Sequence, residues 1–258
     1  MKAVNYIVSA STDAGSVKTS NQDSLNVKTL ALNGETMVFA IICDGMGGLE
    51  KGEVASASMV KAFCNWVLHR LPVLYVNGMN GTQLQEEWFR LIAEYNEKIK
   101  IYGKKSAINM GTTVTAMLLT GRYYYLVNVG DSRAYEIQSD IKVLTRDHTV
   151  VAREVEQGLL TPEQAEEDPR RSVLLQCIGA SDVVYPDFFF GETRKDAVYM
   201  LCSDGFRHEI TPEEIFGYFH PGRMLNEAVM KESETALIAL NKQRQERDNI
   251  SVITIRTF

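Results

Sequence analysis

The sequence predicts a layered α+β fold in which one sheet packs on another and the helices lie outside. Three observations favour it: strands and helices are grouped, the strands come in runs, and pairs of helices flank those runs. The 258 residues are enough for one domain with a sizeable core, and no repeat, low-complexity segment or linker divides them. We therefore expect a single domain over residues 1–258.

Apolar periodicity gives the elements in order. Strands are expected at residues 3–10 and 36–43, and two helices follow, separated by a loop with the sequence LPVLYVNGMNGT. The apolar positions of these helices are Ala55, Met59, Phe63, Trp66 and Val67, then Leu84, Trp88, Leu91, Ile92, Tyr95 and Ile99. Four closely spaced strands at 113–120, 122–130, 133–138 and 141–145 predict an antiparallel meander. A helix over 225–240 precedes the last strand at 250–256.

Residues 157–171, QGLLTPEQAEEDPRR, differ from the rest of the chain. Thr161 has the position of an N-cap, Pro162 that of the first helical residue, and Gln164 completes a capping box. Pro169 should end the helix. The segment is typical of a short polar helical flap, with a plain surface loop as the alternative.

Aspartates stand at the ends of four apolar runs: Asp44 in VFAIICDG, Asp131 in YYYLVNVGD, Asp204 in VYMLCSDG and Asp248 in DNISVITI. Carboxylates gathered at one sheet edge repel each other unless a cation is present, and oxygen ligands prefer Mg²⁺, Mn²⁺ or Ca²⁺ to zinc. The alternative is that each Asp-Gly simply turns the chain. Two near-copies of apolar-x-Cys-x-Asp-Gly favour a multi-carboxylate metal site, a kind of site that commonly transfers phosphoryl groups.

Composition excludes several classes of partner. A net charge of −6 argues against nucleic acid or an anionic membrane. The four cysteines form no CxxC pair and are expected to be reduced core thiols. The N-terminus lacks a signal-peptide core, and no run approaches the length of a transmembrane helix. We expect a soluble, cytoplasmic protein.

Seven motifs in order resemble one family. They are TDAGSVKTSNQD (12–23), CDGMGG (43–48), GTT (111–113), VGDSRAY (129–135), TRDHT (145–149), CSDG (202–205) and DNIS (248–251). Together they resemble the metal-dependent serine/threonine protein phosphatases of the PPM family (protein phosphatase 2C type). The methionine of CDGMGG is similar to the bacterial branch. The resemblance covers nearly the whole chain.

The resemblance implies a four-layer α-β-β-α sandwich, with two antiparallel sheets flanked by helix pairs and a metal site at one end. It implies a flap at about 149–176. Two Mn²⁺ or Mg²⁺ ions, with a third more weakly bound, are implied as cofactors. The implied ligands are Asp23 through water, the Gly45 carbonyl, and the carboxylates of Asp44, Asp131, Asp204 and Asp248, of which Asp44, Asp204 and Asp248 are the catalytic set. Gly47 and Gly48 would allow close backbone approach.

The implied reaction is the hydrolysis of phosphoserine and phosphothreonine in proteins by a hydroxide that bridges two metals. The partners implied are phosphoproteins and a cognate serine/threonine kinase, with the chain a monomer. Lys18 stands where the family usually has a phosphate-binding arginine, so it keeps the charge but loses the bidentate fork. Gln22 replaces a metal-binding glutamate of some members, and His148 is expected to be structural.

Two other functions compete with this one. A catalytically silent relative would bind phosphoproteins without hydrolysis, and Lys18 is the only feature in its favour because every metal-site aspartate is present. A phosphohydrolase acting on nucleotides or small phosphate esters would need a basic, aromatic-lined base pocket, which the sequence does not indicate. An EF-hand is excluded, because DGMGGLEKGEV lacks the further oxygen side chains that such a loop needs.

Overall fold

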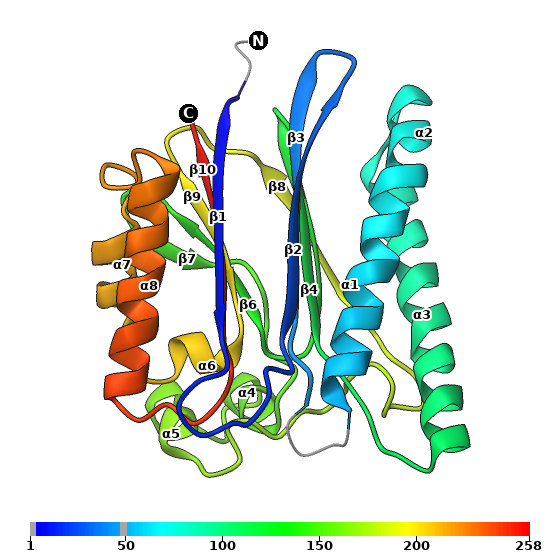
Figure 1. The fold of residues 1–258 in the computed structure, drawn as a ribbon, viewed down its shortest axis with the longest axis vertical. Helices are drawn as coiled ribbons and strands as arrows, with labels where there is room; N and C mark the ends of the chain where they lie inside the picture. Colours follow the sequence, from blue (N-terminus) through cyan, green and yellow to red (C-terminus); the bar gives the residue numbers. More distant parts are fainter. Residues whose placement is uncertain (1–3, 47–50) are drawn as a thin grey trace.

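The computed structural model describes residues 4–46 and 51–258, which form two antiparallel five-stranded sheets packed face to face (Figure 1). The first sheet has the order β1-β10-β9-β6-β7 and the second β2-β3-β4-β5-β8. The strands are β1 (Tyr6–Asp13), β2 (Ser24–Leu32), β3 (Glu35–Cys43), β4 (Val114–Leu119), β5 (Tyr123–Val129), β6 (Arg133–Ile137), β7 (Ile141–Val143), β8 (Asp187–Glu192), β9 (Val198–Cys202) and β10 (Ile250–Thr257).

Helices cover the outer face of each sheet, which confirms the predicted four-layer sandwich (Figure 1). The second sheet is covered by α1 (Gly52–His69), α2 (Leu71–Val76) and α3 (Gly81–Ser106). The first is covered by α7 (Pro212–Phe219) and α8 (Glu227–Gln243). Three short helices, α4 (Val150–Glu156), α5 (Pro162–Glu167) and α6 (Asp204–Arg207), lie at one end.

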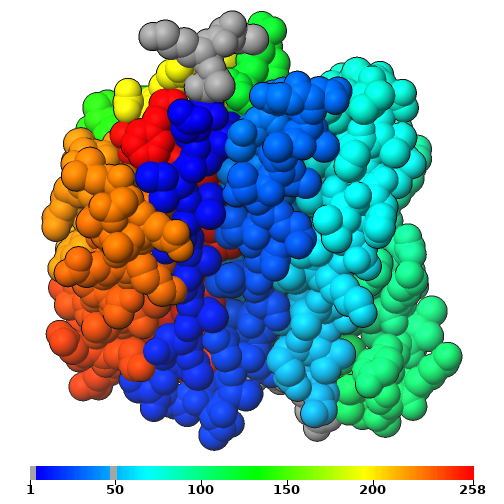
Figure 2. All heavy atoms as spheres, turned by 45° about the horizontal axis from the view of Figure 1, so that its top comes forward, coloured from blue at the N-terminus to red at the C-terminus, as the bar shows by residue number. Residues whose placement is uncertain are grey.

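The continuous apolar strands follow from this layering. Side chains on one face of β3, β4, β9 and β10 pack between the two sheets, and those on the other face pack against helices. Neither face of these strands meets water, so the polar alternation of a half-exposed strand is absent. Edge strands β1 and β2 are only partly buried and lie side by side on one face of the molecule (Figure 2).

Several elements differ from the prediction. The expected meander is wrong: β4 and β5 belong to one sheet and β6 and β7 to the other, because the turn after Gly130 crosses between layers. The predicted loop LPVLYV is helix α2. The helix expected over 225–240 begins at Glu227, since Asn226 caps it and Leu225 is exposed.

Five further elements were not predicted: β2, β8, α4, α6 and α7. A two-residue Asn33-Gly34 turn with positive φ at both residues joins β2 to β3, and this dipeptide is a hairpin signal. Helix α7 begins with a capping box between Thr211 and Glu214 of the kind predicted correctly for α5. Over the described parts of the chain, no helix is long and apolar enough to cross a membrane. All four cysteines are free thiols, as expected.

Candidate metal centre

Five aspartates meet at one end of the sandwich, and we call them the aspartate cluster: Asp23, Asp44, Asp131, Asp204 and Asp248. Strand register explains the convergence. Ser24 pairs with Cys43, so Asp23 and Asp44 are neighbours. Val252 pairs with Cys202, which brings the start of β10 beside the end of β9, with Asp248 just before β10 and Asp204 at the start of α6. The structure thus brings together every carboxylate that the sequence marked.

The electrostatics of the aspartate cluster are those of uncompensated negative charge. Burial, followed by the charges of the other four aspartates, raises the pKa of Asp44 well above its usual range. Burial and the Asp204 charge likewise raise the pKa of Asp131. Burial raises the pKa of Asp23 to about 7, with Asp204 and Asp248 adding to the shift. Each carboxylate would therefore be stabilised by a cation placed among them.

Asp204 behaves differently from its neighbours. Burial would raise its pKa, but the charges of His208 and Arg207 and a hydrogen bond from the Asp44 carboxyl hold the pKa below its usual value. Burial also lowers the pKa of His208, so the permanent charge in this group is that of Arg207. Asp204 is therefore the carboxylate that stays ionised most readily.

Several carboxylate oxygens of the aspartate cluster have no hydrogen-bond partner, which indicates whether a cation would fit among them. Both carboxylate oxygens of Asp23 and Oδ1 of Asp204 are buried without a hydrogen-bond partner, a costly arrangement for an anion. Over residues 4–46 and 51–258, no three His, Cys, Asp or Glu side chains already stand at coordinating geometry. The donors present, carboxylates and a backbone carbonyl, fit a hard divalent ion.

The backbone of Asp44 is fixed by the two threonines of the GTT motif. Its N–H donates to Thr113 Oγ1 at 2.9 Å. Its carbonyl accepts from the Thr113 N–H and from Thr112 Oγ1, both at 2.9 Å. These three bonds hold Asp44 at the point where β3 ends, with its side chain at the cluster. The motif therefore has a positioning role that the sequence did not reveal.

Gly45 lies where no other residue would fit. Its N–H donates to the Gln22 carbonyl at 3.2 Å, and a Cβ here would lie 2.5 Å from that oxygen and 2.6 Å from the backbone of Gly52. The chain can pass so close to the cluster only because this residue has no side chain. Gly47 and Gly48, which we expected to act in the same way, lie outside the described residues.

The turn that carries Asp248 is organised by Glu246, which the sequence analysis missed, and by Asn249 of the DNIS motif, whose role it did not identify. Glu246 Oε1 accepts the backbone N–H of Asp248 at 2.8 Å. Asn249 accepts from the Gln22 N–H at 2.9 Å and donates to the Ala14 and Ser20 carbonyls. Asn249 thereby holds the loop between β1 and β2 against this turn.

That loop brings Lys18 to the aspartate cluster. Lys18 Nζ lies 3.1 Å from Asp248 Oδ1, and both side chains are about one-third exposed. The ammonium group therefore stands at the solvent side of the cluster, next to a predicted metal ligand. A residue in this place can reach an anion bound above the aspartates.

A buried ion-pair group lies directly behind Asp131, and we call it the arginine group: Arg133, Asp147 and Arg207. Arg133 forms a bidentate pair with Asp147, with Nε–Oδ1 at 2.9 Å and Nη2–Oδ2 at 2.8 Å. Arg207 Nη2 donates to Asp147 Oδ2 at 3.2 Å and to the Asp131 carbonyl at 2.9 Å. Burial would raise the pKa of Asp147, but the two guanidinium groups hold it below its usual value.

His148 has the contacts of a structural residue. Its Nδ1 accepts from the Gly130 N–H at 3.2 Å and from Gln176 Nε2 at 2.8 Å, so the ring proton is on Nε2. That nitrogen lies 3.1 Å from Asp187 Oδ2. The ring therefore joins the end of β5, the flap segment and β8, and it has no free nitrogen for proton transfer.

The flap segment, residues 149–176, contains α4 and α5 and returns to its starting point. Its base is closed by a bridge between Thr149 and Leu174 and by a bond from the Leu175 N–H to the His148 carbonyl at 2.8 Å. The capping box of Thr161 and Gln164 is present, and α5 ends before Pro169 as expected. The segment lies at the same end of the sandwich as the aspartate cluster (Figure 1).

Comparison with known proteins agrees with this geometry. The family model described as protein phosphatase 2C matches residues 12–240. The protein phosphatase PhpP of Streptococcus pneumoniae is 34% identical over 212 residues, covering 81% of this chain and 82% of that protein. A serine/threonine phosphatase of Staphylococcus aureus superposes with a TM-score of 0.84 at 26% identity, covering 99% and 97% of the two chains. The catalytic domain of the phosphatase PstP, solved in complex with two manganese ions, superposes with a TM-score of 0.78 at 26% identity and 99% coverage of both.

The matched segment extends over most of the chain, and it includes every aspartate of the cluster except Asp248. The solved relatives share the two-sheet sandwich described above. The chain therefore belongs to the protein phosphatase 2C family, among the bacterial protein serine/threonine phosphatases of the PPM type.

Proposed function

We propose that the chain hydrolyses phosphoserine and phosphothreonine in proteins with two divalent cations, Mn²⁺ or Mg²⁺, held by the aspartate cluster. The observation that carries this proposal is the gathering of five carboxylates at one end of the sandwich, with buried, unpartnered oxygens on Asp23 and Asp204. The two manganese ions of the PstP complex support the same number of ions for this chain.

The residues at the strand ends would each bind particular cations. Asp44 would lie between two cations, and the Gly45 carbonyl would bind one of them. Asp204 and Asp248 would complete the other, while Asp23 would hold a cation through water. Asp131, together with Asp204, would hold a third ion more weakly. This weakness has a physical reason, because the arginine group directly behind Asp131 repels a further cation.

When bound, the cations would supply Lewis acidity and activate water at neutral pH, so that no protein nucleophile is needed. The chain's own residues hold the ligands and place the substrate. Thr113 and Glu246 fix the backbone of Asp44 and Asp248. Lys18 would contact the phosphoryl group as a point charge, and the cations would release Asp248 from its pair with that lysine.

The structure adds no observation in favour of the catalytically silent alternative, which rests on Lys18 alone. No aspartate of the cluster is replaced, and the cluster is exposed to solvent through the Lys18 side. We further propose that the chain acts in the cytoplasm as a monomer and opposes a serine/threonine kinase. The support for these points is its similarity to bacterial serine/threonine phosphatases.

Hydrolysis of a phosphothreonine peptide tests the proposal. Phosphate release should be rapid with Mn²⁺, comparable or slower with Mg²⁺, and absent in excess EDTA. Full turnover in EDTA would rule out the metal mechanism. Strong hydrolysis of a nucleotide with none of the peptide would instead indicate a phosphohydrolase with another substrate class.

A further inference from the structure

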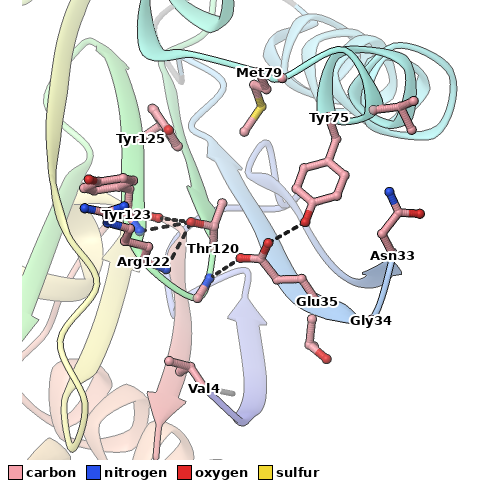
Figure 3. Close-up of a pocket in the computed structure, with 14 residues that line it drawn as sticks. Val4, Asn33, Gly34, Glu35, Tyr75, Met79, Thr120, Arg122, Tyr123 and Tyr125 are labelled. Carbon is pink, nitrogen blue, oxygen red and sulfur yellow. Dashed lines mark hydrogen bonds between the residues drawn. The ribbon is translucent and has the colours of Figure 1, made fainter. Parts of the chain in front are cut away.

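A second hollow lies at the opposite end of the sandwich from the aspartate cluster. We call it the turn-end pocket, because the turns β2–β3, α2–α3 and β4–β5 surround it (Figures 1 and 3). Its volume is about 680 Å³, within the range of about 300–1,000 Å³ typical of ligand sites. Tyrosine, valine and methionine side chains supply part of its wall, among them Tyr75, Met79, Tyr123 and Tyr125.

One carboxylate, that of Glu35, points into the turn-end pocket (Figure 3). Its Oε2 accepts from the Tyr75 hydroxyl at 2.6 Å and its Oε1 from the Gly121 N–H at 2.8 Å. A carboxylate accepts about four hydrogen bonds, so two positions remain open. Within the described part of the chain, no Lys, Arg or His pairs with this half-buried charge.

The tyrosines around Glu35 respond to its uncompensated charge. The hydrogen bond to Glu35 raises the pKa of Tyr75. Burial first and the Glu35 charge second raise the pKa of Tyr6, whose hydroxyl has no partner among the described residues. Burial raises the pKa of Tyr125, with smaller contributions from Tyr123 and from the Glu35 charge. Each tyrosine therefore stays a neutral phenol, with an electron-rich ring beside a carboxylate.

This chemistry selects one class of ligand. An anion would be repelled by Glu35, and a neutral apolar group would leave the carboxylate uncompensated. An ammonium or guanidinium group gains a charge-assisted hydrogen bond to Glu35 and an attraction to tyrosine faces, while an apolar stem packs on Met79 and the aromatic wall. The chain's net charge of −6 adds a weak long-range attraction for such a group.

Arg122 is an example of a guanidinium group on the wall of this pocket, and its charge also repels a second cation there. Its guanidinium lies over the Tyr123 ring, 4.8 Å from the centroid, so the wall of this pocket already accepts such a group on a tyrosine face. Because Arg122 is exposed, water screens its repulsion of a second cation more than it screens the half-buried Glu35. The space next to Glu35 remains the more negative part of the pocket.

We propose that the turn-end pocket binds the lysine or arginine side chain of a polypeptide partner, with Glu35 as its counter-ion. The occupant is a polypeptide because the pocket is much larger than a cationic head group and lies open between three turns, so that neighbouring residues of an extended chain can lie in it. The site is distinct from the aspartate cluster, so a partner held here leaves the candidate metal centre free.

Titration of the protein with blocked amino acids tests the proposal, with binding followed by NMR chemical-shift changes. The probes are N-acetyl-argininamide, N-acetyl-lysinamide and the uncharged N-acetyl-norleucinamide, with putrescine as a free diamine. At least one of the two charged amino acids should saturate a site that shifts residues of the three turns. Absence of saturable binding by both, equal affinity for the norleucine compound, or tighter binding of putrescine than of both would overturn the proposal.

Two substitutions, Glu35→Gln and Arg122→Gln, test the role of charge in this binding, with Glu232→Gln and Tyr75→Phe as controls. Glu35→Gln should weaken binding of the charged probe at least tenfold, whereas Glu232→Gln, at an exposed glutamate of α8, should leave it unchanged. Arg122→Gln should preserve or tighten binding by removing a like charge. Tyr75→Phe keeps the Glu35 charge and should retain binding, which keeps the test valid if Glu35→Gln folds poorly. Unchanged binding in Glu35→Gln, or weakened binding in Arg122→Gln, contradicts the proposal.

Discussion

The aspartate cluster and the arginine group are neighbours at one end of the sandwich, and they surround their carboxylates with opposite charges. Asp131 and Asp147 are both buried carboxylates, yet the pKa of Asp131 is raised and that of Asp147 is lowered. The difference is two guanidinium groups, since Arg133 and Arg207 both donate to the Asp147 carboxylate while Asp131 receives an arginine bond only at its backbone carbonyl. The charge of Asp147 is balanced within the chain, whereas that of the aspartate cluster is not, and we propose that cations from outside balance it.

The largest effect should follow from removing single charges from the aspartate cluster. Asp44→Asn, Asp204→Asn and Asp248→Asn should each lower kcat for a phosphothreonine peptide by at least about 10²–10³-fold, since each removes a charge that holds a cation. Circular dichroism should show a retained fold. Near-normal turnover in any one variant would show that its carboxylate is not a ligand.

Asp147→Asn and Asp44→Asn should change stability in opposite directions in the metal-free protein. The first leaves Arg207 and the half-buried Arg133 without their shared counter-ion and should cost up to about 3–5 kcal/mol of unfolding free energy. The second relieves repulsion and should stabilise the fold. Denaturant unfolding in EDTA at pH 7.5 measures both. Destabilisation of similar size in the two variants would remove the distinction between the regions.

The pH dependence of metal-free stability should separate the two regions as well. A carboxyl group whose pKa is raised in the folded protein binds its proton more tightly when folded. Its contribution to the free energy of unfolding is therefore full below the pKa of the unfolded chain and is lost as the pH rises from there to the folded pKa. For Asp23 the window runs from 3.8 to about 7. Asp147, with its lowered pKa, stabilises the fold above its unfolded value, and that stability is lost as pH falls through the folded pKa.

Thermal unfolding in EDTA between pH 4 and pH 8 measures this dependence. Asp23→Asn should flatten the decline of stability toward pH 8, with the wild-type chain as reference. A decline that is identical in the two proteins would mean that Asp23 does not titrate in this range. Saturating Mn²⁺ should also reduce the decline, because it replaces protons as the source of positive charge.

The smallest effect is expected at Lys18, at the margin of the aspartate cluster. Lys18→Ala should raise KM for a phosphopeptide and lower kcat/KM, with a loss of about 1–3 kcal/mol of transition-state stabilisation. Lys18→Arg should leave KM unchanged or lower it, because the planar guanidinium can bind two phosphate oxygens. Steady-state kinetics of the two variants are the measurement. A change of less than about twofold in kcat/KM for Lys18→Ala would assign phosphate recognition to another residue.

The sequence predicted the residues of the aspartate cluster but not the contacts of the arginine group. The aspartates at strand ends are local signals, because an apolar run followed by Asp-Gly can be read without knowledge of the fold. Arg207 and Glu246 carry no such signal, since their roles arise only when β5, β9 and the turn before β10 meet in space. The split of β4–β5 and β6–β7 between two sheets was missed for a similar reason, because closely spaced strands look the same in one sheet or two.

Calorimetric titration of the metal-free protein with Mn²⁺ tests the central claim most directly, namely that the aspartate cluster is completed by cations. We predict two ions bound per chain at pH 7.5, a third only at much higher concentration, and loss of at least one of the two tight ions in Asp44→Asn. Asp147→Asn, where it folds, should retain both tight ions. A wild-type chain that binds no Mn²⁺, or an Asp44→Asn chain that binds it as the wild type does, would show that the aspartate cluster is not a metal site.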